Sequence, residues 1–136
     1  MGVTFLLDTH VVLWLRGDPT RVHPELRDVL GDPRNRLLVS AASAMEVATK
    51  TRLGKLEIGR SLMPTWTAWL RETAAEELAI SGEHALLAGS MPWEHRDPFD
   101  RLLVAQALVE GVPLVSSDAA IRAVPGLRTV DPTTGR

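Results

Sequence analysis

The chain has 136 residues, enough for one domain whose folding would bury about 68% of the surface of the unfolded chain. Its composition, 45% hydrophobic and 24% charged, excludes wholesale disorder, and the absence of cysteine excludes disulfides, thiolate metal sites and a cysteine nucleophile. A net charge of −2 argues mildly against a nucleic-acid partner, because proteins that bind phosphates usually carry a basic excess.

The N-terminal segment Val3–Leu15 is apolar except where Asp8 and His10 interrupt it. No Lys or Arg precedes this segment and no small-residue cleavage site follows it, so we expect neither a signal peptide nor a membrane span. Together with the absence of cysteine, this pattern predicts a cytoplasmic protein.

Short apolar runs alternate along the chain with segments of helical periodicity. The predicted strands are Val3–Leu7, Arg36–Val39, Leu78–Ile80, Pro113–Ser116 and Leu127–Val130. The predicted helices are Thr9–Arg16, Pro24–Leu30, Ala41–Arg52, Pro64–Thr73, Glu83–Ala88 and Pro98–Glu110. Because the strands are apolar throughout, the alternation predicts an α/β fold with a central parallel sheet of about five strands. No linker divides the chain, so we expect a single domain over residues 1–136, with a frayed tail at Asp131–Arg136.

Acidic residues follow several of the predicted strands. Asp8 and Asp118 each come after a strand and before a helix, where an aspartate serves either as a helix N-cap or as a ligand at the carboxyl edge of a sheet. Glu46 belongs to a capping box if its helix begins at Ser43. If the helix begins at Ser40, Glu46 lies in the second turn and has no capping role.

The segment Asp97–Asp100 has the sequence of a helix start. Asp97 suits the N-cap and Pro98 the first helical position, so the helix start accounts for both residues. It leaves Asp100 free for another role. If the strands are parallel, the carboxylates of Asp8, Glu46, Asp100 and Asp118 converge at one edge of the sheet. A hard divalent cation such as Mg²⁺ or Mn²⁺ would offset their repulsion.

Four elements of the sequence, in this order, resemble the PIN-domain ribonucleases of the VapC toxin type. They are Leu6–His10, Ser40–Lys50 with Leu53–Leu56, His95–Ala107 and Ser116–Asp118. The resemblance covers essentially the whole chain, and the run from His95 to Leu103 is its most specific part. Met45 and Ser117 depart from residues that are frequent in relatives, but neither departure removes an acidic residue.

The resemblance implies a PIN-like three-layer sandwich and a metal-dependent endoribonuclease that acts as the toxin of a toxin–antitoxin pair. It implies that Asp8, Glu46, Asp100 and Asp118 hold Mg²⁺ or Mn²⁺. It also implies a homodimer, an RNA substrate and a cognate VapB-like antitoxin. Our hypothesis for the chemistry is a metal ion that lowers the pKa of a bound water and polarises the scissile phosphate, with Glu46 either orienting the water or completing the metal's ligand shell.

Bound divalent cations would reverse the local charge at such a cleft, and basic residues lie near it in the sequence. The candidates for RNA contact are Lys50, Arg52, Lys55, Arg96, Arg101 and Ser117. For each basic residue the alternative is a solvated surface charge or a local salt bridge. Arg101 has the further alternative of orienting a carboxylate, and Ser117 that of capping a helix.

Two histidines, His10 and His95, are expected to be structural, because nothing in the sequence pairs them with a nucleophile. The apolar stripe formed by Trp66, Trp69 and Leu70 belongs either to the core or to an interface. A haloacid-dehalogenase-like phosphatase is disfavoured because that chemistry needs an aspartate where this chain has His10. A non-catalytic PIN-like module that binds RNA or protein remains the alternative function.

Overall fold

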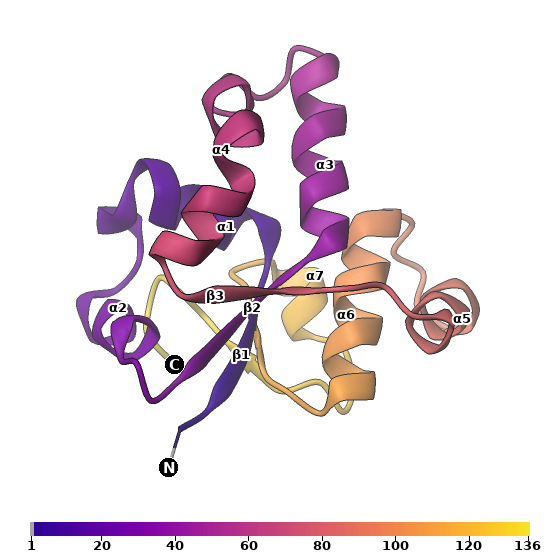
Figure 1. Cartoon of the computed structure of the whole chain (residues 1–136). Coiled ribbons are helices and arrows are strands. Elements are labelled where there is room, and N and C mark those ends of the chain that lie inside the picture. The colour runs from indigo at the N-terminus through magenta and orange to yellow at the C-terminus, as the bar shows by residue number, and fades with distance from the viewer. Residues whose placement is uncertain (1) are drawn as a thin grey trace.

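The computed structural model describes residues 2–136 and contains one five-stranded sheet (Figure 1). The strands are β1 (Thr4–Leu7), β2 (Arg36–Ser40), β3 (Ala75–Leu78), β4 (Leu114–Val115) and β5 (Thr129–Val130). All neighbouring pairs are parallel, and the order across the sheet is β3-β2-β1-β4-β5. β1 therefore lies at the centre, where Leu6 is paired with Leu38 on one side and with Leu114 on the other.

Helices follow most strands and cover both faces of the sheet. They are α1 (Thr9–Gly17), α2 (Pro24–Gly31), α3 (Ala41–Arg52), α4 (Gly59–Glu72), α5 (Gly82–Ser90), α6 (Pro98–Glu110) and α7 (Ala119–Arg122), with a short 3₁₀ turn at Pro19–Arg21. The predicted α/β class, the parallel sheet and the layered sandwich are confirmed. None of the helices in residues 2–136 combines the length and the apolar character needed to cross a membrane.

The core divides into two layers because successive residues of a strand point to opposite faces. Phe5 and Leu7 of β1 pack with residues of α1, α2 and α4, whereas Leu6 packs with residues of α6 and α7. Trp69 and Leu70 are buried in the first layer and Trp66 packs partly buried against it, so this stripe contributes to the core.

The predicted bounds of the third strand and of the fourth helix are wrong. The third strand lies at Ala75–Leu78 and not at Leu78–Ile80. Its Glu76 and Glu77 are exposed because β3 is an edge strand, so it lacks the apolar run of a central strand. α4 begins at Gly59 and not at Pro64, which lies inside the helix.

The last residues, expected to fray, form a hydrogen-bonded turn. The side chain of Asp131 accepts from the backbone N–H of Thr133, and its main-chain oxygen accepts from Gly135. Pro132 is buried, and its carbonyl accepts from the backbone N–H of His23 at 2.7 Å. The tail is therefore held against the start of α2.

Candidate active site

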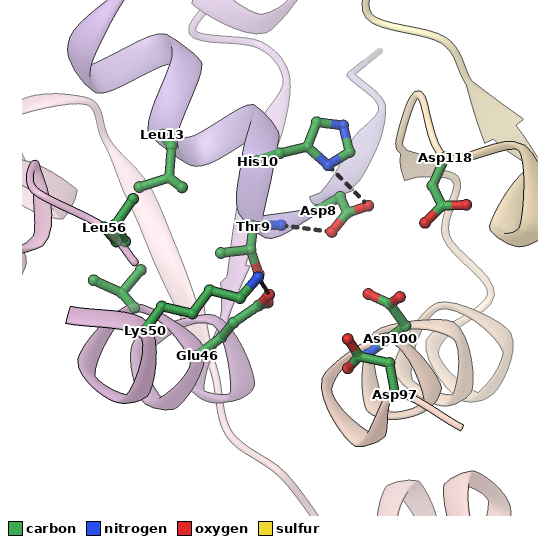
Figure 2. Close-up of a pocket in the computed structure, with 11 residues that line it drawn as sticks. Asp8, Thr9, His10, Leu13, Glu46, Lys50, Leu56, Asp97, Asp100 and Asp118 are labelled. Carbon is green, nitrogen blue, oxygen red and sulfur yellow. Dashed lines mark hydrogen bonds and ion pairs between the residues drawn. The ribbon is translucent and has the colours of Figure 1, made fainter. Parts of the chain in front are cut away.

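The four acidic residues singled out in the sequence line one cavity of about 280 Å³ at the carboxyl edge of the sheet (Figure 2). Asp8 follows β1, Asp118 follows β4, Glu46 projects from α3 and Asp100 from the first turn of α6. The parallel topology brings these segments together, since the carboxyl ends of parallel strands share one edge of the sheet. The remaining lining residues are Thr9, His10, Leu13, Val47, Lys50, Leu56 and Asp97.

Asp8 is the most firmly held of the four carboxylates. It is 4% exposed and accepts hydrogen bonds from the backbone N–H of Thr9 at 2.7 Å, from Ser116 Oγ at 2.6 Å and from His10 Nδ1 at 3.2 Å. Burial alone would raise the pKa of Asp8, but the hydrogen bonds from His10, Ser116 and the backbone of Thr9 hold it below the ordinary value. Asp8 is therefore a preorganised carboxylate, and it also caps α1.

His10 connects two strand ends. The backbone N–H of Ser117 donates to His10 Nε2 at 3.2 Å, so this nitrogen is an acceptor and the ring proton lies on Nδ1, which faces Asp8. Ser117 Oγ lies 2.9 Å from the same nitrogen. Ser117 is thus bound to His10 and does not cap α7, a role that Asp118 fills by accepting from the backbone N–H of Ala120.

Glu46 lies in the second turn of α3 because the helix begins at Ala41 with Ser40 as its N-cap. The capping-box interpretation of Glu46 is therefore wrong. The side chain is buried, Oε2 accepts from the ammonium of Lys50, and Oε1 has no hydrogen-bond partner among the described residues. A buried carboxylate oxygen without a partner is costly unless another group completes its coordination.

Asp100 is released from capping by Asp97, whose Oδ1 accepts from the backbone N–H groups of Phe99 and Asp100. The prediction of Asp97 as the N-cap is confirmed. Burial raises the pKa of Asp100 to about 6, and the nearby charges of Asp97, Asp8 and Glu46 add to this, while a hydrogen bond with His95 opposes it.

His95 belongs to the site, although the sequence suggested only a structural role. Its Nε2 lies 2.7 Å from Asp100 Oδ2. One ligand atom each from His95, Asp100 and Asp118 lie within 4.8 Å of one another, close enough to share a metal ion. The only signal in the sequence was the position of His95 within the same motif as Asp100.

The basic residues predicted to contact RNA divide into three groups. Lys50 lines the cavity. Arg52, Lys55 and Arg96 are exposed and lie outside the cavity lining. Arg101 differs from both, because its guanidinium donates to four backbone carbonyls, those of Ala88, Met91, Trp93 and His95.

Within residues 2–136 the guanidinium of Arg101 therefore bonds backbone carbonyls and not a carboxylate, so the alternative that it directly orients a carboxylate is wrong. Its donors hold the loop between α5 and α6, where Trp93 and His95 stack with ring centroids 4.6 Å apart. Arg101 thus fixes the segment that carries His95 toward Asp100.

The donor set suits a hard divalent cation. Carboxylates from four segments surround one cavity, Glu46 offers a buried oxygen without a partner, and the raised pKa of Asp100 reflects burial and uncompensated negative charge. Oxygen ligands of this kind favour Mg²⁺ or Mn²⁺.

Comparison with known proteins identifies the family of this chain. The family model of the PIN domain matches residues 5–127. Ribonuclease VapC22 of Mycobacterium tuberculosis (strain ATCC 25618 / H37Rv) is 28% identical over 122 residues, which cover 88% of this chain and 90% of that protein.

Solved structures share the fold. They include VapBC2 from Rickettsia felis bound to a promoter DNA fragment, with a TM-score of 0.70, 15% identity and coverage of 93% of this chain and 97% of that chain. DNA-bound VapBC from Salmonella typhimurium has a TM-score of 0.70, 18% identity and coverage of 95% and 98%. At these identities the likeness shows the fold alone.

Proposed function

The chain belongs to the PIN-domain family, and from this premise we propose that it is a metal-dependent endoribonuclease that acts as the toxin of a toxin–antitoxin pair. The observation that carries the proposal is the cavity at which Asp8, Glu46, Asp100 and Asp118 meet, with one buried oxygen of Glu46 left without a partner. The name of the relative VapC22, a ribonuclease, supports RNA as the substrate class.

In this proposal Asp8, Asp100 and Asp118 hold Mg²⁺ or Mn²⁺, while Glu46 completes the shell or orients the attacking water. When bound, the cation would lower the pKa of a water molecule and polarise the scissile phosphate. The protein's own contribution is preorganisation. Ser116, His10 and the backbone N–H of Thr9 fix the Asp8 carboxylate, and His95 fixes that of Asp100.

Protonation of Asp100 would also be linked to metal binding. The raised pKa of Asp100, about 6, means that part of the metal-free protein carries a proton there near neutral pH. Binding a cation would release that proton, since the carboxylate must be ionised to act as a ligand. The negative net charge ceases to be an obstacle to RNA binding, because a divalent cation inverts the local charge of the cavity.

Partners are proposed on the same basis. The structural neighbours are VapBC assemblies, which supports a VapB-like antitoxin for this chain. A homodimer is proposed with it, from the resemblance of the sequence motifs to VapC toxins.

The proposal is tested by incubating the purified protein with end-labelled structured RNAs in the presence of Mg²⁺ or of EDTA. We expect cleavage that requires the metal and yields discrete fragments. Binding to several RNAs without cleavage under either condition would instead identify a non-catalytic PIN-like module.

A further inference from the structure

Lys50 is the one cavity-lining residue of the described chain with a permanent positive charge. It lies one helical turn after Glu46 on α3, and its ammonium donates to Glu46 Oε2 (Figure 2). The two side chains differ sharply in exposure, at 45% for Lys50 and 6% for Glu46. The ammonium therefore reaches from the solvent side onto a buried carboxylate.

This pairing has an electrostatic cause. A buried carboxylate without a counter-ion is strongly unfavourable, and Glu46 shares the cavity with Asp97 and Asp100. Lys50 offsets this negative charge without closing the site, because it satisfies only one oxygen of Glu46.

The other acidic residues of the site have partners that do not compete with a cation in the same way. Asp8 is held by a hydroxyl, a backbone N–H and an imidazole, and Asp118 accepts from a backbone N–H. The lysine has a flexible stem of four methylene groups and a compact charge, so it can leave its partner without disturbing the packed core.

We propose that Lys50 is a displaceable counter-ion, which neutralises Glu46 until a divalent cation takes that carboxylate and then offers its ammonium to the RNA phosphate at the cavity. This inference rests on the proposed function. It predicts two effects of opposite sign for removal of the lysine charge: tighter binding of the metal and weaker binding of the RNA.

The variants K50M and K50Q remove the charge, K50R keeps it, and R71M removes a charge from an exposed arginine of α4 outside the cavity. Mn²⁺ affinity is measured without RNA by electron paramagnetic resonance of the free ion. We expect K50M and K50Q to bind Mn²⁺ at least about threefold more tightly than the wild type, because a competing charge is gone. R71M should remain within about twofold of the wild type, and K50R should show no gain in Mn²⁺ affinity, because the competing charge is still present.

The second measurement is the dependence of RNA cleavage on RNA concentration and on salt at saturating Mn²⁺. K50M and K50Q should require more RNA for half-maximal rate, and the slope of log affinity against log salt should fall by about 0.7, the value for one lost phosphate contact on a single strand. K50R should keep the salt slope of the wild type, because the positive charge that contacts the phosphate is still present.

The outcomes separate the two proposals. If the wild type binds Mn²⁺ and cleaves RNA while K50M and K50Q show unchanged or weaker Mn²⁺ affinity, the role proposed for Lys50 is overturned and the proposed function stands. An unchanged salt slope in these variants does the same. A wild-type protein that neither binds Mn²⁺ nor cleaves RNA overturns the proposed function and this inference with it.

Discussion

Replacing Asp100 with asparagine should stabilise the metal-free protein near neutral pH while removing a carboxylate that the proposed chemistry needs. The folded-state pKa of Asp100 is raised from 3.8 to about 6, chiefly by burial. A group of this kind contributes stability that is fully present below its unfolded pKa and is lost as the pH rises through its folded pKa. Near pH 8 the ionised carboxylate is therefore a net cost to the metal-free fold.

The magnitude follows from the shift. About two pK units correspond to an upper limit of about 3 kcal/mol at 1.36 kcal/mol per unit. Water reaches this carboxyl in part, and the amide keeps only part of the bond with His95, so we expect a net gain of about 1 kcal/mol for Asp100→Asn. For a chain of this length that gain raises Tm by about 3 °C.

The assay is thermal unfolding followed by circular dichroism in EDTA, for the wild type and Asp100→Asn, at about pH 8 and about pH 4. Asp28→Asn, at an exposed position of α2, is the matched control and should show no pH-dependent difference from the wild type. The advantage of Asp100→Asn should be present at the higher pH and vanish at the lower one. The reasoning would be refuted if Asp100→Asn were less stable than the wild type at the higher pH, or if its gain in Tm were the same at both pH values.

Five further substitutions, at four positions, test the structure by urea unfolding. Arg101→Lys loses most of the four hydrogen bonds to backbone carbonyls and should lower the free energy of unfolding by about 2 kcal/mol. An unchanged free energy of unfolding would contradict the role of Arg101 in holding the loop between α5 and α6. A Cβ at Gly59 would lie 1.7 Å from Thr51 Oγ1, so Gly59→Ala should lower the free energy of unfolding by about 1–3 kcal/mol. At Gly89 an added Cβ has no neighbour within 4 Å, so Gly89→Ala should raise the free energy of unfolding by about 0.5 kcal/mol. Equal effects at the two glycines would count against the packing of α3 on α4. Asp97→Ala should cost about 1 kcal/mol through loss of the N-cap, while Asp97→Ser retains stability.

The sequence predicted the central elements well because their patterns are governed by burial. β1 and β2 are apolar on both faces, and α3 and α6 begin and end where the capping residues and Gly111 predict. β3 was misplaced because an edge strand needs no apolar run, and Glu76 pairs with Arg36 on the exposed neighbouring strand end. The start of α4 depends on a tertiary contact, since only a residue without a side chain fits beside Thr51.

For the site, the sequence identified which residues reach the cavity but not how they are bonded. Asp8, Asp100 and Asp118 follow from strand ends and helix starts, which are local signals, whereas Glu46 lies in the second turn of α3 and followed from the motif around it. The uses of His95 and Arg101 depend on the path of the loop between α5 and α6, which is fixed by hydrogen bonds to backbone carbonyls. Hydrogen bonds to backbone carbonyls produce no periodicity and no bias in composition from which the sequence could predict them.

The most direct test of the proposed active site is RNA cleavage by Asp8→Asn at saturating Mg²⁺, with an unchanged circular dichroism spectrum as the control for folding. Asparagine keeps the size of the side chain and its acceptance from Thr9 but removes the charge. We expect cleavage to be lost while the fold is retained. Cleavage at the wild-type rate would contradict the assignment of this cavity as the active site.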